Sequence, residues 1–147
     1  MRFRTLIVAT TLCIFLVACA TEQAVRRDDR PRAVVERLFY AFNRHDANAL
    51  AELYASDAVL VSPDHPVPLH GPTGVRSVYA ELFKQFPDIR DRVVGITEQD
   101  DRAAVEFVST GCTADHVQCL ELPIATVLTL RGGRIVRDVS YFAPPGR

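Results

Sequence analysis

The sequence has no apolar run long enough to cross a bilayer, and its basic residues form no patch. A spanning helix needs about twenty consecutive apolar residues, whereas residues 6–18 form an apolar stretch of only thirteen. The positive charges are almost all arginine and the formal net charge is −1. Internal repeats and low-complexity tracts are also absent. These absences argue against an integral membrane protein, a repeat protein and a nucleic-acid-binding protein.

What remains is the composition of one globular domain. The chain has 147 residues, of which 48% are hydrophobic and 24% charged. That length is enough to bury a core, and these proportions of hydrophobic and charged residues are those of a globular protein rather than a disordered one. We place the domain at residues 31–143, followed by a tail at residues 144–147.

The N-terminus is typical of an export signal. Arg2 and Arg4 precede the short apolar run, which ends in Leu16-Val17-Ala18-Cys19. This ending resembles the bacterial lipobox, in which a small residue precedes a cysteine that is lipidated. Residues 1–18 are therefore predicted to be a lipoprotein signal peptide, although an ordinary cleaved signal or an uncleaved anchor would also fit.

The lipobox resemblance implies a location. Cys19 would carry the lipid, palmitate included, and residues 19–30 would tether the domain to the membrane. Ala20 follows the cysteine, where an aspartate in many bacteria signals retention at the inner membrane. We expect a protein of the bacterial cell envelope, at the outer membrane if one is present.

Two of the four cysteines remain for the domain. Cys112 and Cys119 flank a loop that joins two predicted strands, and an exported protein meets oxidising conditions. We predict a disulfide between them, with two free thiols as the alternative.

The periodicity of apolar residues predicts three helices and five strands. The helices cover residues 31–42, 47–54 and roughly 73–86, and the strands cover residues 58–61, 89–97, 102–110, 120–130 and 135–142. The last two strands are joined by Gly132 and Gly133, as in a tight hairpin. This order predicts an α+β fold with a curved antiparallel sheet and helices on one face.

Several stretches resemble one known family. They are residues 38–50, residues 53–59, His70-Gly71, residues 132–135 and Tyr141-Phe142. Together they resemble the SnoaL-like branch of the nuclear transport factor 2-like (cystatin-like) superfamily. The resemblance covers nearly all of the predicted domain.

The resemblance implies a cone-like half-barrel in which the sheet and three N-terminal helices enclose one apolar pocket, and it suggests a homodimer through the sheet. It does not imply one activity, because this fold hosts isomerases, cyclases, hydrolases and binding modules. Ser62 and Leu38 stand where steroid isomerase relatives carry an aspartate and a tyrosine. Ala104, Glu106 and Ser140 stand where limonene epoxide hydrolase relatives carry an arginine and two aspartates.

Two carboxylates are candidates for catalysis. Glu106 lies in an apolar strand, where it would face either the pocket or water. Asp138 shares a strand face with Ser140, and could be an acid–base group or a charge at the edge of the sheet. Further candidates for ligand binding are Tyr40, Tyr54, His65, His70 and Tyr141.

Two hypotheses about the function follow from the sequence. The first is a module that binds a small apolar or amphipathic molecule, or an envelope partner. The second is an isomerase, cyclase or hydrolase that uses a pocket carboxylate and no cofactor. The spacing of the histidines matches no strong metal signature, so no metal is predicted.

Overall fold

The computed structural model describes residues 29–143, so the predicted signal peptide, Cys19 and most of the tether lie outside the described residues. The elements run in the order α2 (Pro31–Asn43), α3 (Ala47–Glu52), β1 (Tyr54–Val61), β2 (Leu69–His70), α4 (Gly71–Gln85), β3 (Arg90–Gln99), β4 (Arg102–Cys112), β5 (Cys119–Arg131) and β6 (Arg134–Tyr141). Within residues 29–143, no helix combines the length and the apolar character needed to cross a bilayer.

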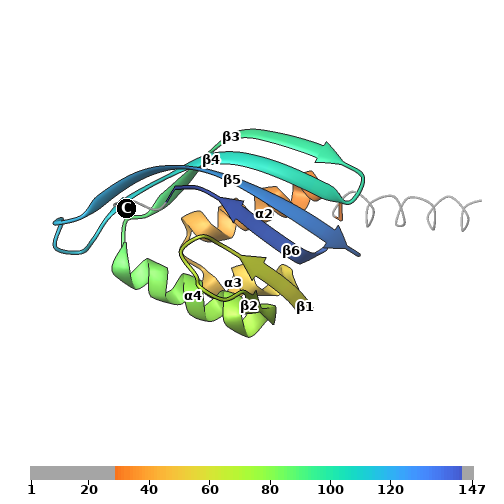
Figure 1. Cartoon of the computed structure of the whole chain (residues 1–147), viewed down its shortest axis with the longest axis horizontal. Coiled ribbons are helices and arrows are strands. Elements are labelled where there is room, and N and C mark those ends of the chain that lie inside the picture. Colours follow the sequence, from red (N-terminus) through yellow and green to blue (C-terminus); the bar gives the residue numbers. More distant parts are fainter. Residues whose placement is uncertain (1–28, 144–147) are drawn as a thin grey trace, which may run out of the picture.

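Six strands form one curved, unclosed sheet in the order β2-β1-β6-β5-β4-β3. Figure 1 shows the sheet arching over the helices. The predicted α+β class is confirmed. One pair differs from the expected antiparallel arrangement, because β1 pairs with β6 in parallel, with Val61 opposite Val139. The rest of the sheet intervenes in sequence between these two strands, so no hairpin forces them to run in opposite directions.

Helix α2 covers the sheet with the apolar stripe that the sequence predicted. Its buried residues include Val34, Val35, Leu38, Phe39 and Phe42. The Phe39 ring meets the Phe107 ring of β4 edge to face, with centroids 4.9 Å apart. Phe42 packs in the same way against Phe83 of α4 at 5.3 Å, which joins the two long helices. These contacts fix α2 over one half of the sheet and α4 beside it.

The boundaries around β1 and at the start of α4 differ from the prediction. The second helix ends at Glu52, and β1 already begins at Tyr54, which the sequence pattern had assigned to the helix. Helix α4 begins at Gly71 rather than near residue 73. Gly71 has a φ of 63°, and a Cβ there would lie 2.9 Å from the Ser56 carbonyl oxygen. Only glycine therefore allows the helix to start this close to β1.

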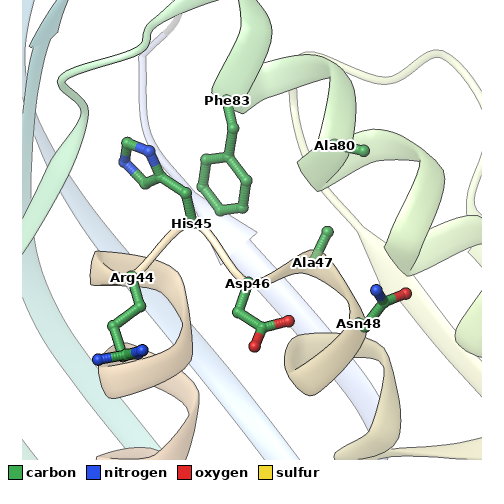
Figure 2. A pocket seen from close by; sticks show the side chains of 7 residues that line it. All are labelled: Arg44, His45, Asp46, Ala47, Asn48, Ala80 and Phe83. Atoms are coloured by element: carbon green, nitrogen blue, oxygen red, sulfur yellow. The ribbon is translucent and has the colours of Figure 1, made fainter.

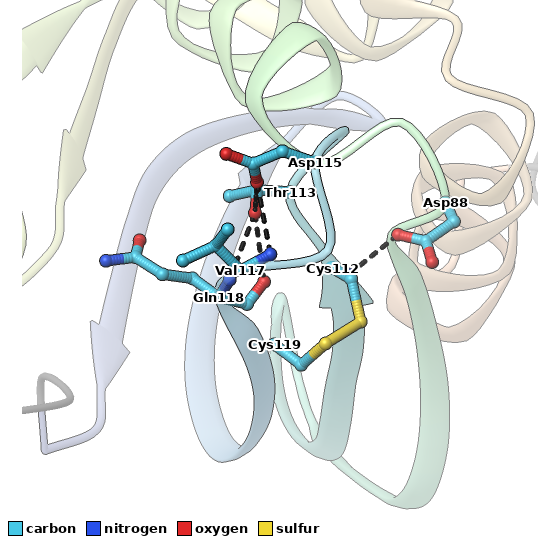
Figure 3. The surroundings of a disulfide bond; sticks show 7 residues. All are labelled: Asp88, Cys112, Thr113, Asp115, Val117, Gln118 and Cys119. Carbon is cyan, nitrogen blue, oxygen red and sulfur yellow. Dashed lines mark hydrogen bonds between the residues drawn. A yellow bond between two sulfur atoms is a disulfide. The ribbon is translucent and has the colours of Figure 1, made fainter.

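A disulfide closes the hairpin between β4 and β5 (Figure 3). Cys112 and Cys119 are directly opposite each other in the register, with an S–S distance of 2.01 Å, so the predicted pairing is confirmed. The Cys112 main-chain N–H also donates to the Asp88 carboxylate at 2.7 Å. This bond ties the hairpin to the segment that leads into β3.

The disulfide should make a measurable contribution to stability. Replacing both cysteines by serine is expected to lower the free energy of unfolding by about 2–3 kcal/mol, the value that loop-closure entropy gives for so short a loop. Denaturant unfolding with and without a thiol reductant measures this. Wild type should lose the same amount on reduction and the Cys112→Ser/Cys119→Ser variant should lose none. A wild type that is indifferent to reductant would contradict the assignment.

Candidate functional site

A pocket of about 390 Å³ lies between α4 and the inner face of the sheet. Residues from α2, α4, the loop after β1 and strands β1 and β3 to β6 reach it. Its apolar lining consists of Phe42, Leu60, Val78, Leu82, Phe86, Ile89, Phe107, Leu120, Leu122, Ile124 and Phe142. Its polar lining consists of Ser62, Asp64, His65, Tyr79, Glu81, Gln85, Asp91, Ser109 and Ser140. A mostly apolar hollow with a few polar groups is typical of a small-molecule site.

Strand alternation builds the sheet side of this pocket. In β4, Phe107 and Ser109 face the pocket. Glu106, the residue before Phe107, is exposed. In β5, Leu120, Leu122 and Ile124 follow the same period of two. The first of these follows Cys119 directly, so the disulfide holds one end of the pocket wall.

Asp91 is the least exposed of the three carboxyl groups that line the pocket. It lies at the start of β3, opposite Ser109 of β4. The Asn43 side chain clamps its backbone, accepting from the Asp91 N–H at 2.8 Å and donating to the Asp91 carbonyl at 2.9 Å. Because Asn43 is the last residue of α2, the end of that helix fixes where the carboxyl group stands.

The surroundings of Asp91 disfavour its ionised form. Its Oδ1 atom is buried and has no hydrogen-bond partner among the described residues. Burial raises the pKa of Asp91 to about 7, although the Ser109 hydroxyl acts in the opposite direction. A carboxyl group that titrates near neutral pH can bind a cation or transfer a proton.

A second carboxyl group, that of Asp138, lies deeper, and each of its oxygens accepts a hydrogen bond. Asp138 is 3% exposed. Its Oδ2 accepts from the Tyr54 hydroxyl and its Oδ1 from the Thr126 hydroxyl, both at 2.6 Å. Burial raises the pKa of Asp138, and both hydrogen bonds oppose that rise. Ser140, which does line the pocket, donates to the Thr126 hydroxyl at 3.3 Å, so a chain of hydrogen bonds links the pocket wall to Asp138.

Tyr79 brings a hydroxyl group from α4 to the pocket. Burial raises the pKa of Tyr79, and the negative charges of Asp138, Asp91 and Asp64 raise it further. The phenol therefore stays protonated at neutral pH and can donate a hydrogen bond.

Four of the predicted site residues lie away from the pocket. Glu106 is exposed on the opposite face of the sheet, across from Ala125. Tyr141 is 60% exposed and Tyr40 is 66% exposed, the latter beneath the Arg44 guanidinium. His70 is an exposed residue of the short edge strand β2. The structure therefore does not bring these four together.

Of the other predicted residues, His65 lines the pocket, while Tyr54 and Asp138 form the buried pair behind it. Asp91 was not among the predicted site residues. Its chain neighbours Arg90 and Arg92 are both charged, which does not suggest a pocket-facing position. The alternation of Ile89, Asp91 and Val93 was the available signal that it faces inward.

A separate polar hollow of about 410 Å³ lies where the α2–α3 turn meets α4 (Figure 2). His45 stacks on Phe83 there, with ring centroids 4.6 Å apart. The His45 Nε2 atom lies 2.8 Å from the Ile89 carbonyl oxygen and 2.7 Å from a guanidinium nitrogen of Arg90. The contacts join the turn to Ile89, just before β3, and to Arg90, the first residue of β3, so this histidine has a structural explanation.

The model of the SnoaL-like domain matches residues 35–138, and the chain belongs to this family. No curated protein matches it. Within the part of the chain that the structure describes, no group of three or more histidine, cysteine, aspartate or glutamate residues could hold a metal ion.

Solved structures share the fold. A ketosteroid isomerase-like protein of Catenulispora acidiphila, in complex with trimethylamine, is 22% identical, with a TM-score of 0.70 over 75% of this chain and 85% of that one. An NTF2-like protein of Burkholderia pseudomallei is 19% identical, with a TM-score of 0.67 over 75% and 88%. The candidate polyketide cyclase IdmH of Streptomyces antibioticus is 27% identical, with a TM-score of 0.64 over 76% and 91%.

Removing the Asp91 charge should change how stability depends on pH. The folded-state pKa of about 7 exceeds the ordinary value of about 4, so the folded protein binds more protons between these pH values. Wild type should therefore lose stability relative to Asp91→Asn as pH rises from 4 to 7. Above pH 7 we expect a difference on the order of 2 kcal/mol, discounted for partial exposure. Denaturant midpoints from pH 4 to 8 measure it, and parallel curves for the two proteins would contradict the burial effect.

Proposed function

We propose that this domain binds a small, mainly apolar molecule in the pocket between α4 and the sheet. The observation that carries the proposal is a pocket with eleven apolar lining residues and a partly buried carboxyl group, that of Asp91, whose buried Oδ1 atom has no hydrogen-bond partner among the described residues. Apolar walls supply affinity and a few fixed polar groups supply orientation. The volume of about 390 Å³ suits a compact ligand rather than a long lipid chain.

Filling the pocket should abolish binding. Val78 lines the pocket on α4, whereas Val94 of β3 is 59% exposed. Val78→Trp is expected to weaken the binding of N-phenyl-1-naphthylamine, a neutral fluorescent probe, by at least about tenfold, because the new ring occupies the pocket. The matched control Val94→Trp should bind as wild type does. Equal titration curves for both variants would place the probe elsewhere.

Catalysis by proton transfer is the second candidate function. Asp91, with a pKa near 7, has the property that a general base needs at neutral pH. Tyr79 is a protonated donor in the same pocket. The likeness to IdmH, a candidate polyketide cyclase, is compatible with such chemistry.

Hydrogen exchange in a bound ketone tests this candidate. The Asp91 carboxylate would remove a proton from the carbon next to the carbonyl of 2-tetralone, leaving an enolate. The carboxyl group would exchange that proton for a deuteron of D₂O and return the deuteron to the same carbon, with no other reactant. Wild type should accelerate the exchange measured by NMR, Asp91→Asn should not, and the control Asp101→Asn in the β3–β4 turn should behave as wild type. Equal rates with and without protein would leave binding as the function.

We also propose that the domain is exported and lipid-anchored at Cys19. The N-terminal pattern and the Cys112–Cys119 disulfide, which suits an oxidising compartment, both support this. Cells expressing the full chain should incorporate labelled palmitate into wild type and Cys13→Ser, but not into Cys19→Ser. Label retained in Cys19→Ser would contradict the anchor.

A further inference from the structure

We propose that the pocket selects ligands with a positive charge on an apolar body, such as a hydrophobic amine or a quaternary ammonium. This inference rests on the proposed binding function of the same pocket and adds the chemical class of the ligand. It is carried by the sign and the placement of the ionisable side chains around the pocket.

The ionisable lining is predominantly acidic. Asp64, Glu81 and Asp91 contribute carboxylates, His65 is the one basic side chain, and neither lysine nor arginine occurs among the lining residues of the described chain. A hollow with low-dielectric walls and charges of one sign concentrates ions of the opposite sign. An anionic ligand would instead meet three carboxylates.

The two acids at the rim already have partners. The Asp64 Oδ2 atom lies 3.9 Å from the His65 Nε2 atom, and the Glu81 Oε2 atom lies 3.6 Å from the Lys84 ammonium. Both carboxylates are more than half exposed, at 55% and 59%. Water screens such pairs, so they contribute little to ligand selection.

Asp91 differs from both because no basic side chain among the described residues that line the pocket forms an ion pair with it. Its chain neighbours Arg90 and Arg92 are exposed residues of alternate positions in β3, and Arg90 contacts His45 and the Ile89 carbonyl instead. The clamp by Asn43 prevents the start of β3 from turning the carboxyl group toward water. A ligand cation would supply the missing partner.

The apolar lining also suits a cation. Four phenylalanines line the pocket: Phe42, Phe86, Phe107 and Phe142. The face of an aromatic ring attracts a cation, most strongly where water is excluded. An ammonium ligand beside Asp91 would gain attraction to the carboxylate and to the ring faces as well as apolar contact through its substituents. A neutral isostere of the same shape would gain only the apolar contact.

Asp91 must be ionised to attract the cation, so binding should depend on pH. The other groups that share its surroundings are Tyr79 and Glu81 from α4, Asp64 and His65 from the loop after β1, and Ser109 from β4. Among them only His65 is a basic side chain. Lowering the pH neutralises Asp91 and therefore weakens cation binding.

Three probes of similar size test the preference. Benzyltrimethylammonium, its neutral isostere neopentylbenzene and the anion 4-phenylbutyrate each compete with N-phenyl-1-naphthylamine at pH 8. The ammonium is expected to bind wild type about tenfold more tightly than the isostere, and the anion is expected to bind most weakly. Asp91→Asn should remove most of that advantage and leave the isostere unchanged, while Asp101→Asn should keep it. In wild type the advantage should shrink as pH falls from 8.5 to 5.5.

The outcomes separate the two proposals. If the isostere competes as well as the ammonium, or if the advantage survives in Asp91→Asn and at pH 5.5, the cation preference is overturned while the pocket function stands. If N-phenyl-1-naphthylamine and all three competitors fail to bind wild type, the pocket function itself is overturned. Binding of neopentylbenzene by Asp91→Asn shows that the variant retains a folded pocket.

Discussion

The inner face of the curved sheet has to be covered, and the way in which the helices cover it creates the pocket. Alternate residues of the long strands place an apolar surface on that face. Helix α2 packs on β3 and β4, and α4 packs on β1 and α3. The two helices meet through Phe42 and Phe83 rather than along their full lengths. Between α4 and the far strands the surface stays open, and its apolar area becomes the lining of the pocket.

Two carboxyl groups on the inside of the domain, one buried and one partly buried, have different hydrogen-bonding environments. Asp138 receives a hydrogen bond on each oxygen, from Tyr54 and Thr126, and these hydroxyls replace the water that burial removes. Asp91 stands in the pocket with a buried oxygen that no described residue satisfies. Such a group costs stability unless a partner arrives, which is why a buried polar group without a partner commonly marks a functional site. Asp138 is therefore satisfied within the fold, whereas Asp91 keeps an oxygen without a protein partner among the described residues.

Local constraints at the ends of elements position this chemistry. The Asn43 side chain ends α2 and holds the backbone of Asp91. Gly71 lets α4 start close against β1, which sets the side of the pocket that carries Tyr79. The disulfide and the Asp88 bond fix the hairpin from which Leu120 and Leu122 reach the pocket. Each of these contacts joins segments that are distant along the chain or separated by a loop.

The sequence by itself determined the fold class, the helices, most of the strands and the disulfide, because apolar periodicity and paired cysteines report local geometry directly. It also carried the resemblance to the SnoaL-like family over nearly the whole domain. Only the tertiary structure decided which carboxyl group faces the pocket. Glu106 and Asp91 both occur in strands, and the side of the sheet that each faces depends on the register of β3 against β4 and on which face the helices cover. The sequence pattern also placed Tyr54 in a helix rather than in a strand. Its strand position depends on a long-range contact, because its hydroxyl donates to Asp138 of β6, the strand that pairs with β1.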